Sequence, residues 1–539
     1  MRSDVLIIGA GGAGLVAAIN ANESGAKVRL ITKEYPTRSQ TSMAQGGINA
    51  AFGNVSEDSV EAHIKNTLKS AHGIADEKAV KLLCESAPDA VEWLDTIGVC
   101  FSRTKDAKIA QRTLGGASAP RACYAQDYTG LKILHTLYDR CLSLGIEILN
   151  ERCLLDFITQ ETDKTDVYIG GATVLNIRTG EVESYEAPAV IVATGGYARI
   201  YDKHSTNSTA STGDGIAAAM RAGARLSDME FVQFHPTALK NSSILISESA
   251  RGAGGHLLNS KSERFTNELA PRDEVARAIN DEIQKGENIF LDIRHLGEEF
   301  IDEELPQERK LAKLYENVDP AHELIPIKPV AHYTMGGIEV DENSMTKIKG
   351  LYGVGECANH KVHGANRLGG NSLLELVVFG REAGKNAALY AKNFDKTIDA
   401  SKQTKKAQDF IAGVKDFTNE IDFYEKRSFI GDIFYNNVGI SRDESGLQSV
   451  LEDIRQIQRE VSLMGLKDKS KIYNTNLVEF IEFGNMLELS EIILVCAISR
   501  NESRGAHFRS DMPKENDTAY KAHTITWKEE SLLFSDFME

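Results

Sequence analysis

The stretch Asp4-Val5-Leu6-Ile7-Ile8-Gly9-Ala10-Gly11-Gly12-Ala13-Gly14 decides the fold of this chain. Residues 4–8 form a short apolar run that predicts a buried strand, and a G-x-G-x-x-G pattern follows at once. In this pattern the first glycine permits a tight turn, the second lets backbone approach a pyrophosphate, and the third lets helix and strand pack closely. Apolar side chains then recur at helical spacing before Gly25, and residues 28–31 predict a second strand. The unit is typical of a dinucleotide-binding domain with phosphates at the helix N-terminus.

Two later segments predict further strands of the same parallel sheet. Residues 190–196 and 350–356 are apolar runs that end in glycine. Between them, from about residue 226 to 340, the βαβ rhythm is lost, and beyond Phe379 the apolar pattern becomes helical. A doubly wound sheet interrupted by a large insertion explains why pieces of one cofactor site lie so far apart in the sequence.

Composition excludes several classes of protein. With 539 residues, 42% hydrophobic and 26% charged, the chain is a globular protein of several domains. The net charge of −17 disfavours nucleic acid as a partner. Seven cysteines without a C-x-x-C pair argue for a reducing compartment and against a disulfide frame, a metal site or an iron–sulfur cluster. Because no signal peptide and no run of 18 apolar residues is found, we expect a cytoplasmic protein that reaches a membrane only through another subunit.

The polar stretch from Thr37 to Gly47, T-R-S-Q-T-S-M-A-Q-G-G, favours a flavin over a nicotinamide. Its closing glycines could lay backbone amides along the pyrimidine edge and N5 of an isoalloxazine ring. Asp214, in T-G-D-G, and Glu356, at the end of a strand, are candidate carboxylates for ribose or ribityl hydroxyls. We therefore expect FAD as the cofactor.

The fold class that follows is α/β, with a Rossmann-like FAD-binding domain, an inserted α+β capping domain and a C-terminal helical domain. We expect the first part of the FAD-binding domain in residues 1–225, the capping domain in 226–340, the second part of the FAD-binding domain in 341–395, the helical domain in 396–510 and a polar, weakly held C-terminal tail in 511–539.

The insertion and the segment after it hold five glycine-flanked clusters rich in arginine and histidine. They are F-H-P-T at 234–237, S-E-S-A-R-G at 247–252, P-R-D at 271–273, A-H-Y-T-M-G-G at 331–337 and H-G-A-N-R-L-G-G-N-S at 363–372. Taken singly, each arginine or histidine could equally be a salt-bridge partner or a satisfied core residue. Together, guanidinium, imidazole and hydroxyl donors suit a dicarboxylate, because guanidinium binds a carboxylate in a bidentate way.

These motifs, in this order, resemble the flavoprotein subunits of succinate dehydrogenase and fumarate reductase. The resemblance covers nearly the whole chain, through Y-N-T-N-L at 473–477 and E-S-R-G-A-H at 502–507. It implies interconversion of fumarate and succinate by hydride transfer at flavin N5, with electrons exchanged with a separate iron–sulfur subunit. A membrane-anchor subunit is a further candidate partner, at the inner face of the cytoplasmic membrane.

The resemblance also implies site residues. Arg272 would be the proton donor or acceptor, fed by a relay through Glu248 and Arg251. The dicarboxylate would be held by His235, Thr237, Ser247, His332, Arg367 and Gly369. FAD would be held by Gly9, Gly11, Gly12, Ala13, Gly14, Thr32, Lys33, Ser39, Gln40, Thr41, Ala44, Gly46, Gly47, Asp214, Glu356, Asn371, Ser372 and Leu373. No metal ion is expected.

Two positions depart from the family pattern. Members with covalent flavin carry histidine where this chain has Gln40, so we expect FAD without a covalent bond, which makes fumarate reduction the easier direction. At Leu114 these dehydrogenases and reductases carry phenylalanine, and L-aspartate oxidases carry a glutamate that can pair with the substrate ammonium. L-Aspartate oxidase, a free-standing flavoenzyme, is the nearest alternative, and leucine disfavours it. A catalytically silent flavin-binding subunit is the third hypothesis. The physiological direction and the electron carrier, whether quinone, thiol or another, stay open.

Overall fold

The computed structural model describes residues 2–161, 167–529 and 532–538. At its centre lies a parallel five-stranded sheet in the order β17-β10-β1-β2-β6. The strands are β1 (Val5–Ile8), β2 (Val28–Ile31), β6 (Glu147–Leu149), β10 (Ala189–Val192) and β17 (Leu351–Gly353). Strands of parallel sheets are covered on both faces and therefore read as continuous apolar runs, as the segments at 4–8, 190–196 and 350–356 do.

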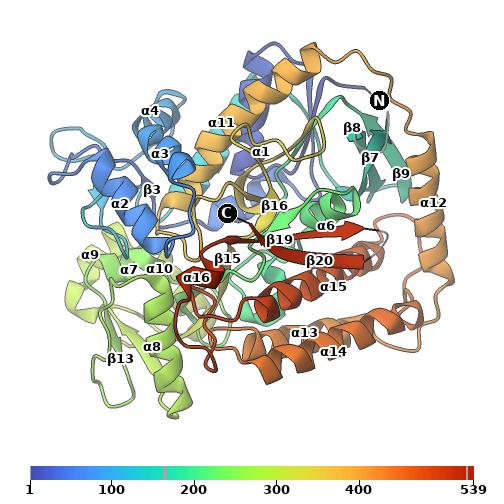
Figure 1. Ribbon diagram of the computed structural model, residues 1–539. Helices are drawn as coiled ribbons and strands as arrows, with labels where there is room; N and C mark the ends of the chain where they lie inside the picture. Colours follow the sequence, from blue (N-terminus) through green and yellow to red (C-terminus); the bar gives the residue numbers. More distant parts are fainter. Residues whose placement is uncertain (1, 162–166, 530–531, 539) are drawn as a thin grey trace.

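Alternate residues of these strands enter two different cores. Val5, Ile7 and Ile191 face a layer of helices, whereas Leu6 and Ile8 face an antiparallel sheet. The helices are α1 (Gly12–Glu23), α5 (Thr129–Ser143) and α11 (Asn371–Lys392), and the antiparallel sheet consists of β7 (Arg152–Glu161), β8 (Val167–Asn176) and β9 (Glu181–Glu186). Figure 1 shows α1 and α11 side by side although they are far apart in the sequence. The α/β prediction is confirmed.

Shorter elements extend this first unit. They are β3 (Ile48–Asn49), α2 (Val60–Ser70), α3 (Glu77–Glu85), α4 (Ala87–Thr96), β4 (Gln111–Arg112), β5 (Ala122–Cys123), α6 (Asp214–Arg221) and β18 (Ala358–Asn359). Strands β3, β5 and β4 form a small antiparallel sheet.

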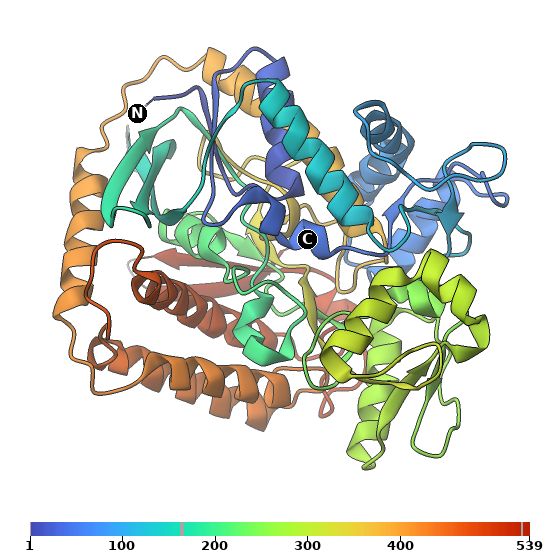
Figure 2. The same ribbon diagram turned by 180° about the vertical axis from the view of Figure 1, so that it is seen from behind.

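The insertion has an apolar core of its own, made of residues between 239 and 327. Its four-stranded antiparallel sheet has the order β12-β15-β14-β13. Its elements are β12 (Val232–Leu239), α7 (Glu248–Gly252), β13 (His256–Leu258), α8 (Arg272–Gln284), β14 (Ile289–Asp292), α9 (Glu298–Glu304), α10 (Pro306–Glu316) and β15 (Ile325–Thr334). Both opposite views show this unit, in yellow-green, at one end of the molecule (Figures 1 and 2). The chain enters the insertion at the start of β12 and leaves it at the end of β15, so these two strand ends connect the insertion to the central body.

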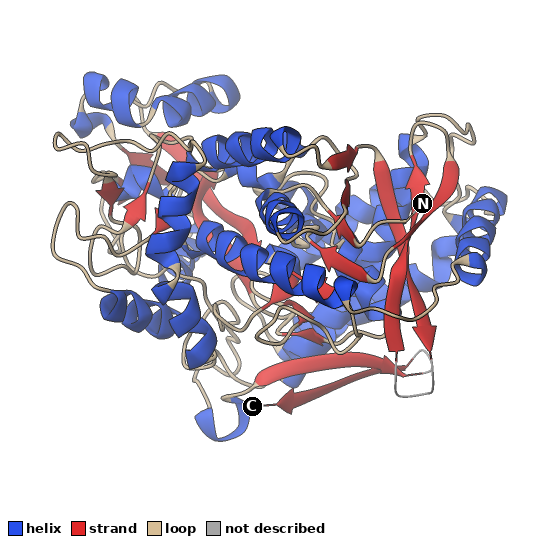
Figure 3. Cartoon of the chain, turned by 90° about the horizontal axis from the view of Figure 1, so that it is seen from above, coloured by secondary structure: helices blue, strands red, loops and turns tan. Residues whose placement is uncertain are grey.

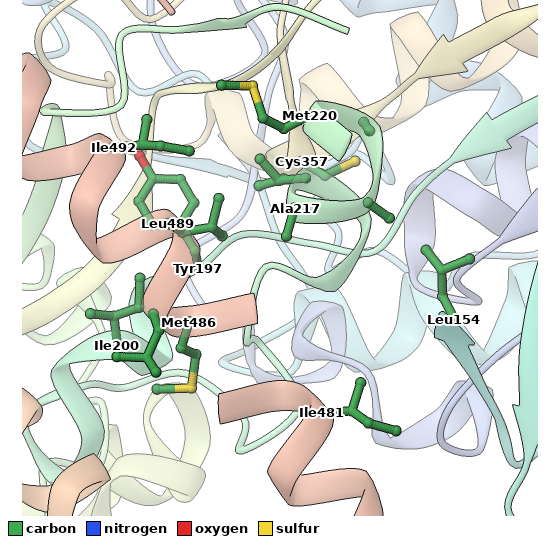
Figure 4. Close-up of a cluster of buried hydrophobic side chains, with 14 of the residues drawn as sticks. Leu154, Tyr197, Ile200, Ala217, Met220, Cys357, Ile481, Met486, Leu489 and Ile492 are labelled. Atoms are coloured by element: carbon green, nitrogen blue, oxygen red, sulfur yellow. The ribbon is translucent and has the colours of Figure 1, made fainter. Parts of the chain in front are cut away.

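Four long helices follow α11 in the described part of the chain. They are α12 (Ser401–Asp416), α13 (Phe423–Asn437), α14 (Glu444–Glu460) and α15 (Thr475–Ser499). Helix α15 is buried nearly all round. Figure 4 shows why: its side chains Met486, Leu489 and Ile492 lie against Tyr197 and against Ala217 and Met220 of α6. Among the described residues, no helix is both long and apolar enough to cross a membrane.

The end of the chain differs from the expectation of a weakly held tail. After α16 (Asp517–Tyr520), β19 (His523–Glu529) and β20 (Leu532–Met538) form a hairpin along one edge of the molecule (Figure 3). Strand β19 also pairs with β11 (Leu226–Ser227), which pairs with β16 (Gly337–Glu339). His523 Nδ1 lies 2.6 Å from Asp228 Oδ2. The prediction is wrong for β19 because Thr524, Ile525 and Thr526 form a short β-branched run that is buried where β19 pairs with β11 as well as with β20.

Candidate functional site

One large cavity runs from the glycine motif after β1 to the insertion. Its empty volume is about 1630 Å³, a figure that includes space open to solvent. The wall carries both the glycine motif after β1 and the arginine and histidine side chains of the insertion, so one continuous cavity joins the predicted dinucleotide and dicarboxylate residues. The predicted residues on its wall are Gly9, Gly11, Gly12, Ala13, Thr32, Lys33, Ser39, Gln40, Thr41, Ala44, Gly46, Gly47, Asp214, His235, Ser247, Glu248, Arg272, His332, Glu356, Arg367, Ser372 and Leu373.

The glycine motif lies on the cavity wall at the N-terminus of α1. Gly9 has φ +107°, and a Cβ there would lie 2.2 Å from the Ala193 carbonyl oxygen. A Cβ on Gly14 would lie 2.0 Å from the Gly9 carbonyl oxygen, so Gly14 serves packing and is not on the cavity wall. Gly11 caps the helix without a side chain, and the Gly12 N–H donates to Thr41 Oγ1 (3.0 Å). The N–H groups that follow Gly12 and the positive dipole end are left for an anion.

Several buried polar atoms on the cavity wall lack a partner. Ser39 Oγ, Gln45 Oε1 and Thr194 Oγ1 make no hydrogen bond with any described residue. Glu356 accepts hydrogen bonds from the Thr334 N–H (3.0 Å) and hydroxyl (3.3 Å), and burial raises its pKa to about 7. Buried polar groups normally find partners, so these atoms fit the hydroxyl, amide and ring nitrogen groups of a bound flavin dinucleotide.

Lys33 and Asp214 are brought together, with a third residue that sequence reasoning missed. Lys33 Nζ lies 2.7 Å from Asp214 Oδ2 and 2.5 Å from Glu482 Oε1 of α15. Burial lowers the pKa of Lys33, but the two carboxylates outweigh burial and hold it well above its ordinary value. The charged triad fixes the second strand's end to the helical unit. Nothing local in the sequence around Glu482 indicated this pairing.

The cavity's other end gathers the predicted dicarboxylate residues. His235 of β12 and His332 of β15 have ring centroids 4.8 Å apart, and His332 Nδ1 lies 2.7 Å from Thr206 Oγ1. Burial, then Arg272 and Arg251, lower the pKa of His235 well below its usual range. Burial, then His235 and Arg272, do the same for His332. Both imidazoles are therefore neutral hydrogen-bonding groups at pH 7.

A chain of ionisable groups leads away from the cavity through Arg272. Its Nη2 and Nε lie 2.6 and 3.1 Å from Glu248 Oε2, and Arg251 Nη2 lies 3.6 Å from Glu248 Oε1. Burial raises the pKa of Glu248, but Arg272 and Arg251 outweigh it and bring the value to about 2. The carboxylate is therefore ionised between two guanidinium groups. Arg251 itself lies behind the wall, where its Nη1 donates to the Glu268 carbonyl (2.6 Å).

Gln233, another residue that sequence reasoning missed, bridges the two arginines of the cavity. Its Oε1 accepts from Arg272 Nη1 (3.1 Å) and from Arg367 Nη2 (3.0 Å). Its Nε2 donates to Asn366 Oδ1 and to the Arg367 carbonyl. The amide thereby sets the spacing of the two guanidinium groups. Gln233 could have been found from the sequence, because it stands two residues before His235, and residues i and i+2 of a strand share one face.

Three other predicted residues lie off the cavity wall. The Thr237 hydroxyl donates to the Ile246 carbonyl (2.8 Å) and its N–H to His235 Nδ1 (3.2 Å), so Thr237 orients His235. Asn371 bonds Asn49, His63 and Thr67 behind the wall. At Gly369 a Cβ would meet Glu248 Oε2 at 2.7 Å, so this glycine makes room for the carboxylate.

A buried carboxyl pair joins the insertion to the first unit beside Ser247. Asp127 Oδ2 accepts from the N–H groups of Gln307 (2.7 Å) and Glu308 (3.2 Å), and Glu308 Oε1 accepts from the Ser247 N–H (3.1 Å). Burial and Asp127 raise the pKa of Glu308 well above its ordinary value, and burial raises that of Asp127 to about 6. Burial and the neighbouring Asp127 therefore favour the protonated form of Glu308 in the folded chain.

Glu308→Gln is expected to stabilise the protein at pH 8 and to have a smaller effect at pH 5. Above an unfolded pKa of about 4.3, unfolding releases the Glu308 proton, which lowers the free energy of unfolding by up to about 1.4 kcal/mol per pH unit until the folded pKa is reached. Glutamine keeps the acceptor for Ser247 but has no proton to release. Denaturant unfolding of both proteins at the two pH values measures the difference. An equal gain at pH 5 and 8 would show that Glu308 is ionised in the folded chain.

Comparisons with known proteins agree with this geometry. The family described as FAD binding domain matches residues 4–373, and the family described as fumarate reductase flavoprotein C-term matches residues 427–534. The chain is 37% identical to the succinate dehydrogenase flavoprotein subunit of Rickettsia bellii, over 98% of this chain and 94% of the relative. It is 37% identical to the fumarate reductase flavoprotein subunit of Haemophilus influenzae, over 98% and 92%. A solved structure of FrdA from E. coli quinol fumarate reductase superposes with a TM-score of 0.95 and 35% identity, covering 100% of this chain and 97% of that one.

Proposed function

Because the chain belongs to the family of succinate dehydrogenase and fumarate reductase flavoprotein subunits, we propose that it is the FAD-dependent subunit that interconverts fumarate and succinate. The observation that carries the proposal is the end of the cavity, where Arg272 and Arg367 lie with two neutral histidines and a serine hydroxyl. Such a set matches two carboxylates. Arg272 and His332 are both present, which disfavours a catalytically silent subunit.

Binding of the dicarboxylate is assigned to four residues. Arg367 and His332 bind the two carboxylates, and His235 and Ser247 donate further hydrogen bonds. Ser247 is the N-cap of α7, where its Oγ accepts from the Ser249 N–H (3.0 Å) and lies 2.8 Å from Ser249 Oγ. The site is buried, so each of these charge-assisted bonds is stronger than it would be in water.

Proton transfer is assigned to Arg272. FAD, held by the glycine motif, the loop around Ser39 and Glu356, supplies the two-electron hydride chemistry when bound. Arg272 places its guanidinium at the cavity and moves the proton to or from the substrate carbon. Glu248 and Arg251 restore its protonation state, because Glu248 is ionised and within 3.6 Å of both arginines. An arginine can act as an acid only with such a relay behind it.

We expect FAD to be bound without a covalent link. Gln40 lies on the cavity wall, and its Oε1 accepts from the Ser208 N–H (2.7 Å). An amide side chain cannot form the bond that a histidine makes to the flavin in related proteins. After acid precipitation of the purified protein, the yellow flavin should therefore stay in the supernatant. Flavin that remains in the protein pellet would contradict this expectation, and free FAD added to denatured apoprotein is the control.

Partner subunits complete the proposal. The relatives are named flavoprotein subunits, and that of Wolinella succinogenes is named for an 8-methylmenaquinol:fumarate reductase. We propose that electrons pass between FAD and a separate iron–sulfur subunit, and that a membrane-anchor subunit holds the complex at the inner face of the cytoplasmic membrane. The substrate itself is tested on the purified chain with artificial dyes as electron donor and acceptor. The proposal requires turnover with succinate or fumarate, and it fails if neither is converted by FAD-loaded protein.

A further inference from the structure

Arg367 is a buried cation without a direct counter-charge. It is 2% exposed, and no described carboxylate lies within ion-pair distance of it. Among the described residues the only hydrogen bond of its guanidinium is to Gln233 Oε1, and its Nε has no partner. Burial and Arg272 lower its pKa to about 10, while Tyr333 and the more distant Glu356 and Glu248 act in the opposite direction. A guanidinium in this setting needs compensation when the dicarboxylate is absent.

Tyr333 supplies part of that compensation. Arg367 Cζ lies 4.2 Å from the centroid of the Tyr333 ring, in the geometry of a cation–π contact. The Tyr333 hydroxyl donates to Glu375 Oε2 over 2.6 Å. A phenol that donates to a carboxylate becomes more electron-rich, which strengthens its attraction for a cation on the ring face.

Glu375, on the first turns of α11, is the anion behind the ring. Its Oε2 lies 2.9 Å from His363 Nε2, and its Oε1 lies 3.5 Å from His360 Nδ1. Burial raises the pKa of Glu375, but the two histidines outweigh it and hold the pKa well below its ordinary value. The carboxylate is therefore ionised, fixed by groups on both oxygens, and separated from Arg367 by one aromatic ring. The mechanism above gives no role to His363, Glu375 or Tyr333.

We propose that Glu375 is a positioning residue for substrate binding, which acts through the Tyr333 ring to hold the Arg367 guanidinium oriented toward one carboxylate of the dicarboxylate. The proposal rests on the proposed function, because it assigns Arg367 to the substrate. It predicts that Glu375 and Tyr333 affect affinity for the dicarboxylate, while proton transfer at Arg272 and binding of FAD stay as they are.

The test compares Glu375→Gln, Tyr333→Phe and the double variant with the wild type, all loaded with FAD. Glutamine keeps the size and an acceptor but removes the charge, and phenylalanine keeps the ring but removes the bond to Glu375. We expect the Kd for succinate, measured by calorimetry, to rise about tenfold in each single variant, which corresponds to about 1.4 kcal/mol. The double variant should bind succinate no more weakly than the weaker-binding single variant, because both changes break the same series of contacts from Glu375 through Tyr333 to Arg367. The value of kcat at saturation should stay within about twofold.

Glu382→Gln is the matched control, since Glu382 lies on the same helix and pairs with Lys385 at the surface. It should bind succinate as the wild type does. Unchanged affinity in Glu375→Gln or in Tyr333→Phe, or Kd increases that multiply in the double variant, would overturn the proposal. If Glu375→Gln does not fold, two other variants test the proposal. Tyr333→Phe should weaken succinate binding, whereas Glu375→Asp keeps the negative charge and should bind succinate as the wild type does. A wild type that binds FAD but no succinate overturns the proposed function, and the inference with it.

Discussion

Arg272→Lys is expected to lower kcat by orders of magnitude while the KM for the dicarboxylate changes by less than about tenfold. Lysine retains the positive charge that attracts a carboxylate. Arg272, however, uses Nη2 and Nε to bond Glu248 and Nη1 to bond Gln233, and a single ammonium cannot keep this fork and also reach the substrate carbon. The proton would then be delivered from the wrong place, and small misplacements of a reacting group are costly.

Steady-state kinetics with a dye acceptor measure both constants. Arg277→Lys is a suitable control because Arg277 lies on the same helix, faces away from the cavity and pairs with Asp273 (2.8 Å). It should leave kcat unchanged. If Arg272→Lys instead loses affinity and keeps its kcat, Arg272 is a binding residue and the proton donor lies elsewhere.

L-Aspartate is expected to be a donor poorer than succinate by orders of magnitude. Leu114 lies on the cavity wall and is 2% exposed, and it offers the substrate ammonium no charge. The two acids that could replace it are engaged: Asp127 is absent from the wall and bonds the start of α10, and Glu248 bonds Arg272 and the Gly115 N–H (2.8 Å). Burial of an unpaired ammonium costs several kcal/mol, and about 1.4 kcal/mol corresponds to a factor of ten in rate.

The measurement is turnover with dye acceptor for the two donors side by side. Leu114→Glu supplies the missing partner and should raise the ratio of aspartate to succinate turnover, whereas Leu114→Met should leave the ratio unchanged. Aspartate oxidation by the unmodified chain at a rate equal to that of succinate, with iminoaspartate as product, would favour an aspartate oxidase instead.

Local sequence was sufficient for the parts of this protein that are built from consecutive residues. The strand, glycine turn and helix at residues 4–23 are one continuous unit, so the phosphate-binding end of the cavity could be predicted directly. The arginine and histidine clusters could be recognised because glycines flank each of them, and their chemistry suggested a shared ligand. Their convergence on one cavity, with Arg272 and Arg367 held by the same Gln233 amide, followed only from the packing of β12, α8 and the loop before α11.

Contacts between distant segments depended on the tertiary structure. Glu482 stands in the middle of an apolar helix, and its pairing with Lys33 exists only because α15 packs beside α6. Glu375 occurs in a leucine-rich helix start, and its place behind Tyr333 depends on how α11 meets the end of β15. The attachment of the C-terminal strand β19 could not be predicted because it joins the central body through β11, which has two residues, too few to show a period. A sequence pattern reports the face and the period of one element, whereas a buried charge is satisfied by whichever element the fold brings against it.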